Sequence, residues 1–224
     1  MKLTYYGHSA FHIENGNDSI LIDPFITGNP VAPVKAENLH ANAIIVTHGH
    51  EDHVGDTISI AQRCNAEVVA CYELANWFTS KGVKAHGMQI GGSKVFPFGK
   101  VKLTIAHHSS VAPDGTYTGS PAGVLLTIAG KTIYHTGDTG LFYDMKLIGE
   151  MNPVDVMLCP IGDYYTMGID DAVKAVELTN PKLVIPIHYN TFPVITVEAN
   201  VFKSKVESKG YKCVLLTPGE SITI

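Results

Sequence analysis

The segment IIVTHGHEDHVGD, residues 44–56, concentrates three histidines and three acidic residues directly after an apolar run. The histidines are His48, His50 and His53, and Asp52 lies among them. Imidazole and carboxylate groups without a thiolate are typical ligands of zinc, manganese or iron, and they do not suit a closed structural cysteine site. In an extended or irregular loop, His48 and His50 project to the same side and can bind one cation. The chain then turns, so that Asp52 and His53 can face a second cation nearby.

Histidines and an aspartate also follow three apolar strands later in the chain. VKLTIA is followed by His107 and His108, KTIYHTG is followed by Asp138, and KLVIPI is followed by His188. Strand ends are where the sheets of α/β proteins usually assemble their sites, so four strands that end in the same chemistry predict one shared site. Two cations need about six to eight ligand atoms. The candidate metal ligands, with Asp138 able to bridge, are His48, His50, Asp52, His53, His108, Asp138 and His188.

The adjacent pair His107 and His108 leaves one choice open. Successive side chains of a strand point to opposite faces, so only one of the two can readily face the metal. Periodicity alone does not say which face that is.

Further polar residues near these strand ends can support a site. His8 in YGHSAF is a candidate for contacting substrate or for donating a hydrogen bond to a ligand, or else it is a polar residue at a strand edge. Asp23 in LIDP ends an apolar strand, and a buried carboxylate needs a partner. It is expected to accept a hydrogen bond from the ring of a ligand histidine, and Asp163 in PIGDYY is a candidate for the same role. Asn190 and Thr191 are candidates for binding a substrate carbonyl or phosphate, although a simple polar turn explains them equally well.

The apolar pattern predicts a strand-rich first half, followed by alternating helices and strands. Helices are expected at residues 56–64, 72–82, 141–150, 169–178 and 196–208. Strands are expected at 2–7, 10–15, 19–25, 41–48, 66–70, 154–163, 182–190 and 213–217, with further strand pairs around the turns at 98–100 and 129–131. The helices are too few to cover one long parallel sheet, so two packed sheets with helices outside are expected. No repeat or linker divides the chain, which predicts a single domain over residues 1–224.

Composition limits the classes of partner and the compartment. The net charge of −5 and the absence of any Lys/Arg cluster argue against binding to nucleic acid or to an anionic membrane. No apolar run is long enough for a membrane span, and the first residues lack the apolar region of a signal peptide. The four cysteines form no metal-binding pair or disulfide framework. We therefore expect a cytoplasmic protein with a small-molecule substrate, and a homo-oligomer is compatible with the sequence.

The motif THGHEDH, a downstream histidine, the aspartate of TGDT and the late histidine of PIHYN together resemble the metallo-β-lactamase fold superfamily. Within it, GHSAFHIE, LIDPFITGNP, PIGDYYTMG and HYNTFP resemble the UPF0173 family of uncharacterised metal-dependent hydrolases, and more distantly the ascorbate-6-phosphate lactonases. The resemblance covers nearly the whole chain. It implies an α/β (α+β) fold, specifically a four-layer αββα sandwich of the metallo-β-lactamase type.

The resemblance also implies how the ligands divide between two divalent metal ions. His48, His50 and His108 would hold the first ion, and Asp52, His53 and His188 would hold the second, with Asp138 between them. It favours His108 over His107, because the family places this ligand just before its small-residue SS turn. Zinc or manganese is expected, with iron or nickel as alternatives.

These features predict a metal-dependent hydrolase with a dinuclear site. Two cations lower the pKa of a shared water, and the resulting bridging hydroxide attacks a carbonyl or phosphoryl centre. Asp52 and Asp138 are the candidate catalytic residues, which orient this hydroxide and pass its proton to the leaving group. A lactone or other ester and a phosphodiester fit equally well. The alternatives are a di-iron or mononuclear-iron oxidoreductase on the same fold, and a ligand-binding scaffold without catalysis.

Overall fold

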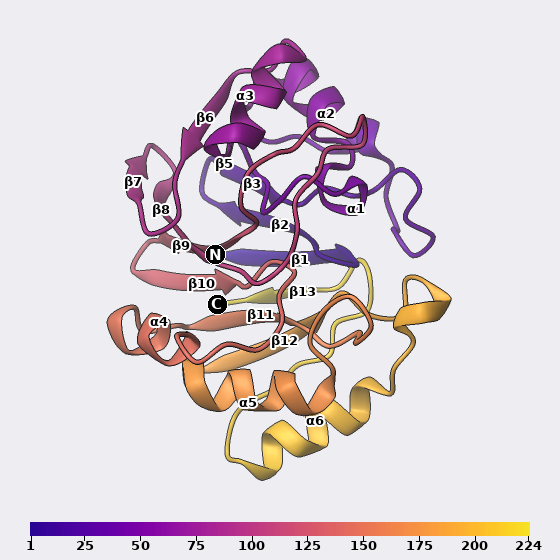
Figure 1. The fold of residues 1–224 in the computed structure, drawn as a ribbon, viewed down its shortest axis with the longest axis vertical. Coiled ribbons are helices and arrows are strands. Elements are labelled where there is room, and N and C mark those ends of the chain that lie inside the picture. Colours follow the sequence, from indigo (N-terminus) through magenta and orange to yellow (C-terminus); the bar gives the residue numbers. More distant parts are fainter.

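The computed structural model describes residues 1–224, in which two β-sheets pack face to face and helices cover both outer surfaces (Figure 1). The first sheet has the order β13-β1-β2-β3-β4-β5-β6, and the second has the order β12-β11-β10-β9-β8-β7. The expected four-layer αββα sandwich is therefore confirmed. The two chain ends lie close together, because Ile224 N–H donates to the carbonyl of Met1 at 3.0 Å.

The elements have the following bounds. The first sheet contains β1 (Lys2–Gly7), β2 (Ala10–Asn15), β3 (Asp18–Ile22), β4 (Ala43–Ile45), β5 (Glu67–Cys71), β6 (Ala85–Met88) and β13 (Ser221–Thr223). The second contains β7 (Ser93–Phe96), β8 (Gly99–Ile105), β9 (Ala122–Ile128), β10 (Lys131–His135), β11 (Val156–Pro160) and β12 (Leu183–Ile187). The α-helices are α1 (Glu51–Val54), α2 (Thr57–Cys64), α3 (Tyr72–Ser80), α4 (Met145–Met151), α5 (Ile169–Thr179) and α6 (Ala199–Ser208), and short 3₁₀ helices span Ala36–Asn38 and Pro193–Ile195.

Three apolar cores hold the layers together. The central core lies between the sheets, and Leu3 of β1, Leu126 of β9 and Leu158 of β11 are fully buried in it. The second core joins the first sheet to α2 and α3, and the third joins the second sheet to α4, α5 and α6. Strands that are covered on both faces need apolar side chains at every position, which explains continuous runs such as VMLCP in β11.

The strand directions bring the chemically interesting residues to one edge of each sheet. β1 and β3 both run antiparallel to β2, and β4 runs parallel to β3, so β1, β3 and β4 end on the same side. In the second sheet β8 and β10 both run antiparallel to β9, and β11 and β12 are parallel to β10. Two backbone hydrogen bonds then join the two edges, from His188 N–H to the His8 carbonyl at 2.8 Å and from Ala122 N–H to the Thr47 carbonyl at 3.0 Å.

Most predicted elements are present within a few residues, but the strand predicted at 213–217 is wrong. Cys213 pairs with Val184 of β12 at a single position. The chain then leaves the second sheet, because Leu216 packs into the central core, and it continues to β13 beside β1. The sequence analysis also missed β6, β13 and α1. Each of these is only three or four residues long, and β6 (AHGM) has no β-branched residue. None of the helices combines the length and the apolar character needed to cross a membrane.

The central core provides a direct test of this packing. Leu126→Ala should lower the free energy of unfolding by about 2–5 kcal/mol, because it removes buried apolar contacts and leaves a cavity. Leu147→Ala is the matched control, since Leu147 of α4 is 52% exposed, and it should change the free energy of unfolding by less than about 1 kcal/mol. Urea denaturation followed by circular dichroism measures both values. Equal losses in the two variants would contradict the core described above.

Candidate metal centre

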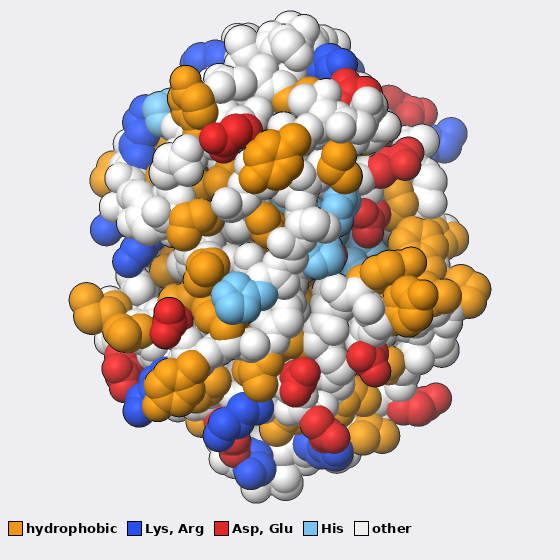
Figure 2. All heavy atoms as spheres, viewed as in Figure 1, with side chains coloured by type: hydrophobic (Ala, Val, Ile, Leu, Met, Phe, Trp, Pro, Cys, Tyr) orange, Lys and Arg blue, Asp and Glu red, His pale blue; other side chains and the backbone are white.

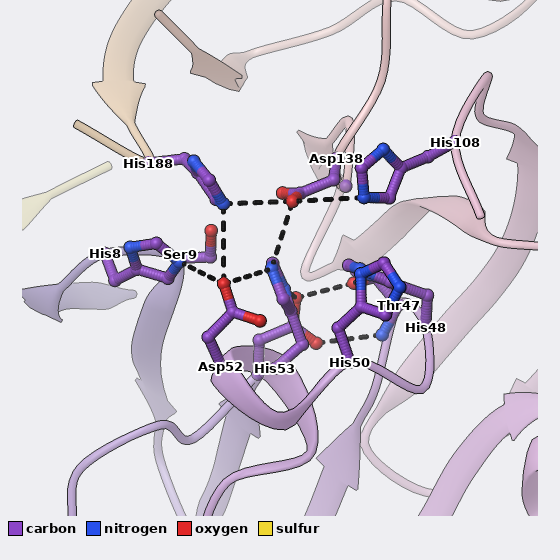
Figure 3. A network of polar contacts seen from close by, with 12 residues as sticks. His8, Ser9, Thr47, His48, His50, Asp52, His53, His108, Asp138 and His188 are labelled. Atoms are coloured by element: carbon purple, nitrogen blue, oxygen red, sulfur yellow. Dashed lines mark hydrogen bonds and ion pairs between the residues drawn. The ribbon is translucent and has the colours of Figure 1, made fainter. Parts of the chain in front are cut away.

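Side chains from both sheets meet at the edge where their strands end (Figure 3). His50, Asp52 and His53 reach this point from the first sheet and α1, and His108, Asp138 and His188 face them from the second sheet. The potential ligand atoms fall into overlapping groups, within each of which the atoms lie no more than 4.8 Å apart. The cluster contains every ligand candidate found in the sequence, namely His48, His50, Asp52, His53, His108, Asp138 and His188.

The loop between β4 and α1 orients His48 and His50. Gly49 between them has no room for a side chain, because a Cβ atom there would lie 2.2 Å from Oγ1 of Thr118. The Gly49 N–H donates to Oγ of Ser110 at 3.0 Å, and the hydroxyls of Ser110 and Thr118 lie 2.6 Å apart. The packed loop turns both imidazoles toward one point, where Nε2 of His48 lies 2.9 Å from Nδ1 of His50.

The carboxylate of Asp23 determines which ring nitrogens of two histidines are free. It is fully buried and accepts hydrogen bonds from the Thr47 N–H at 2.8 Å, the Thr47 hydroxyl at 2.6 Å and Nδ1 of His53 at 2.7 Å. Because the Thr47 hydroxyl donates its only proton to Asp23, it accepts from Nδ1 of His48 at 3.1 Å. Both His48 and His53 therefore carry a proton on Nδ1 and present the lone pair of Nε2 to the cluster. Asp23 thus makes the histidine contact expected from the sequence.

His8 holds the carboxylate of Asp52. It lies in the turn after β1 and is fully buried. Its Nε2 donates to Oδ2 of Asp52 at 2.9 Å, and its Nδ1 accepts from the Thr191 hydroxyl at 3.0 Å. Burial, together with the neighbouring His188, lowers the pKa of His8 to about 4, so the ring is neutral and carries the single proton that this arrangement needs. Thr191 therefore contacts His8, and no contact with a substrate is needed to explain it.

Asp138 lies at the middle of the cluster and is almost fully buried. Its Oδ2 is 2.9 Å from Nε2 of His188, 3.3 Å from Nε2 of His53 and 3.7 Å from Nε2 of His108. It follows β10, His188 follows β12, and His108 follows β8. The position of Asp138 is the one that a bridging ligand would need.

Several buried ligand atoms of the cluster have no hydrogen-bond partner: Nε2 of His53, both ring nitrogens of His188 and Oδ1 of Asp138. Buried polar groups are normally paired, because an unpaired one costs free energy. Ligands on a tetrahedral cation lie about 3.3–3.6 Å apart when each bond is about 2.0–2.2 Å. The separations from Oδ2 of Asp138 lie around this range, at 2.9 Å to His188, 3.3 Å to His53 and 3.7 Å to His108, and the unpaired atoms face one another without hydrogen-bond geometry. The donor set therefore fits a bound cation.

The charges of the cluster also favour a cation. Burial works to lower the pKa of His53, but the carboxylates of Asp138, Asp52 and Asp23 outweigh it and raise this pKa well above its ordinary value. Burial likewise works to lower the pKa of His188, but Asp138 outweighs it and raises this pKa to about 9. Burial would raise the pKa of Asp138, yet His188 and His53 hold it well below the usual range. Positive charge is thus stabilised at the centre, whether protons or a metal ion supply it.

The structure separates the two adjacent histidines after β8. His108 contributes to the group formed with His48 and His50. His107 points away, and its ring stacks on Phe142 with 4.8 Å between the ring centroids. The alternation expected along the chain therefore puts His108 in the cluster and His107 outside it.

Two supporting residues expected from the sequence do not reach the cluster. Asp163 is exposed and lies outside the groups of ligand candidates, so its expected role beside a ligand is wrong. The reason is that Asp163 and Tyr164 adopt left-handed φ angles of 59° and 50°, a turn that places the Asp163 carboxylate near Gly168. Asn190 accepts a hydrogen bond from Val197 N–H at 2.8 Å, which supports the interpretation as a polar turn.

The sequence analysis missed residues that support or line the site. Thr47 directly precedes His48, and a hydroxyl next to a ligand candidate could have indicated a residue that supports the site. A cavity of about 460 Å³ lies against the cluster. Its apolar wall comes from loop residues for which the sequence carries no periodic signal. The cavity is lined by His50, Asp52, His108, Ser109, Asp138, Tyr165, His188, Phe192 and Val194.

Comparisons with known proteins place this geometry among metal-dependent hydrolases. A family model described as a beta-lactamase superfamily domain matches residues 18–189. A UPF0173 metal-dependent hydrolase of Anoxybacillus flavithermus is 55% identical over 228 residues, and one of Carboxydothermus hydrogenoformans is 49% identical over 226, with 100% of both chains covered in each case. Among solved structures, Igni18, described as a novel metallo hydrolase from the hyperthermophilic archaeon Ignicoccus hospitalis, gives a TM-score of 0.92 at 43% identity. That match covers 100% of this chain and 97% of Igni18.

Asp23→Asn should weaken zinc binding by about 10- to 100-fold, because an amide oxygen replaces the carboxylate that orients His53 and, through Thr47, His48. Competition titration with a chromogenic chelator measures the affinity. Asp155→Asn is the matched control, since the Asp155 carboxylate also accepts a backbone hydrogen bond, from Thr132 at 2.9 Å, but lies outside the cluster. Unchanged zinc affinity in a folded Asp23→Asn protein would contradict this role.

His108→Ala should lower the metal content by about one equivalent, because the group formed with His48 and His50 would keep two ligands and zinc normally needs at least three. His107→Ala should retain its metal, since its ring packs on Phe142. Mass spectrometry of metals in the purified variants gives both contents. Loss of metal from His107→Ala alone would reverse the assignment.

Proposed function

Because the chain belongs to the UPF0173 family of metal-dependent hydrolases within the beta-lactamase superfamily, we propose that it cleaves a small-molecule ester, lactone or phosphodiester at a dinuclear metal site. Its relatives are named as metal-dependent hydrolases, and the names specify no substrate. The cluster at the edge where the two sheets meet supports this proposal.

The division of the ligand atoms carries the proposal. His48, His50 and His108 form one group, and Asp52, His53 and His188 belong to a second group together with His8. A third group joins His48 and His53 to Asp138, so the first two groups are neighbours. Two adjacent cation positions with Asp138 between them account for this overlap better than one position does.

The nitrogen and oxygen donors suit zinc or manganese, with iron or nickel as alternatives. Two such ions would supply Lewis acidity and would lower the pKa of a shared water toward neutrality. Asp138 is buried among His53, His108 and His188, so its part is to hold the ions in place.

Asp52 is the residue placed to handle the proton of the attacking water. Its side chain is 29% exposed and lines the cavity, whereas that of Asp138 is 3% exposed. Neighbouring histidines outweigh the effect of burial and keep the pKa of Asp52 below its ordinary value, so the carboxylate stays ionised. It can therefore accept a hydrogen bond from a water in the cavity and fix its orientation, while His8 holds Oδ2 at 2.9 Å.

His50→Ala should abolish hydrolysis while leaving a folded protein, because His50 lies in a half-buried loop and contributes to no apolar core. The measurement is turnover of a panel of lactones, aryl esters and phosphodiesters by protein loaded with zinc or manganese. His40→Ala, an exposed histidine outside the cluster, is the control and should retain full activity. Circular dichroism checks folding.

Full activity of His50→Ala on a substrate of the panel would contradict the proposal. Wild-type protein purified without added metal distinguishes the redox alternative, because a protein that retains iron shows visible absorbance that changes on reduction. No turnover by the wild-type protein with any of the metals would favour a binding function instead.

A further inference from the structure

The cavity beside the cluster has two different faces. Its floor consists of the metal-binding candidates and Ser109, and its wall consists of Tyr165, Phe192 and Val194. Tyr165 and Val194 are 55% and 53% exposed and line the same cavity as Phe192, so the three form an apolar patch beside the cluster, which is a feature of ligand-binding grooves. Figure 2 shows hydrophobic side chains gathered directly beside the histidines in the cleft.

Neighbouring aromatic rings hold Phe192 of this wall in position. Phe192 packs between His8, at 5.6 Å between ring centroids, and Phe25, at 6.3 Å. Tyr165 follows two residues in left-handed conformation, which cost strain and are often found at functional sites. Its ring contacts that of Tyr164 edge to face at 4.6 Å. A preformed apolar surface of this kind suits a rigid apolar group of a ligand.

Acidic side chains border the cavity beside the cluster. A second cavity of about 580 Å³ adjoins the first, since both are lined by Asp52 and Phe192. No Lys or Arg lines either cavity, whereas Glu51 and Asp56 line the second. Figure 2 likewise shows acidic side chains, and no basic ones, next to the histidines of the cleft. The two carboxylates of the cluster, Asp52 and Asp138, would offset half of the charge that two divalent ions bring, and Glu51 and Asp56 add negative charge beside them.

From these two features we infer that the site takes an uncharged ester or lactone whose apolar, aryl-sized arm packs against Tyr165, Phe192 and Val194, and not an anionic phosphodiester. The inference rests on the proposed function and narrows its substrate. In the reaction, water adds to the acyl carbon, the acyl C–O bond breaks, and the leaving oxygen takes a proton. The carboxylic acid product ionises, and Glu51 and Asp56 then repel the new anion from the cavity.

Para-nitrophenyl substrates with different second groups test this inference in the zinc- or manganese-loaded protein. The phenylacetate has a neutral aromatic arm, the acetate has almost no arm, the hemisuccinate has an anionic arm, and bis(para-nitrophenyl) phosphate is the phosphodiester. Relative to its uncatalysed rate, the phenylacetate should have a kcat/KM about 10-fold or more above each of the others, since burial of an aryl group contributes at least this factor.

Variants assign the preference to named residues. Tyr165→Ala and Val194→Asp should each reduce the phenylacetate-to-acetate ratio about 5- to 10-fold, and both positions are exposed enough to tolerate the change. Glu51→Gln should raise the relative kcat/KM for the hemisuccinate several-fold, which is a gain that misfolding does not produce. Tyr143→Ala is the matched control, because Tyr143 is 71% exposed and lines neither cavity, and it should leave the ratio unchanged.

The outcomes separate this inference from the proposed function. A preference for the hemisuccinate or the phosphodiester would overturn the inference and leave the hydrolase proposal standing. An unchanged phenylacetate-to-acetate ratio in both Tyr165→Ala and Val194→Asp would also overturn the inference and leave the hydrolase proposal standing. Failure of the metal-loaded protein to cleave any substrate would overturn both. The expected ratios, together with their loss in the wall variants, would support both.

Discussion

The carboxylate of Asp23 is the group on which the geometry of the site depends. It is fully buried, and its hydrogen bonds to Thr47 and His53 offset the free-energy cost of removing the charge from water. Through these bonds it joins the end of β3 to the end of β4 and aims Nε2 of both His48 and His53 at the same point. A buried residue outside the cluster thereby determines which ring nitrogen each of two ligand candidates presents to it.

The cluster is also a joint between the two sheets. Asp52 and His53 come from the first sheet and Asp138 and His188 from the second, and the hydrogen bond from His188 N–H to the His8 carbonyl closes the edge beside them. Cations bound here would link both halves of the sandwich, so metal occupancy would raise the folding stability. The central apolar core keeps the halves in register, so the unpaired ligand atoms of the two sheets face one another.

The sequence alone determined the ligand types and most of the fold. The spacing of His48, His50, Asp52 and His53 after an apolar strand, and single ligands after three later strands, predicted one site, because the ends of parallel strands meet at one sheet edge. Long apolar runs predicted the buried strands, the small number of helices predicted two packed sheets, and the resemblance to the superfamily implied the four-layer sandwich. The short elements β6, β13 and α1 were missed, since three or four residues carry too little periodicity to be recognised.

Only the tertiary structure decided which neighbouring groups act together. Periodicity left His107 and His108 equivalent, and the position of Phe142 beside His107 distinguishes them. The contact between His8 and Asp52 joins residues 44 positions apart, and the contact between His8 and Thr191 joins residues 183 apart. Asp163 looked like Asp23 in sequence, yet a left-handed turn directs it to solvent. The sequence determines which chemical groups the chain contains and which strands bury them, but hydrogen bonds and packing between distant segments determine where those groups point.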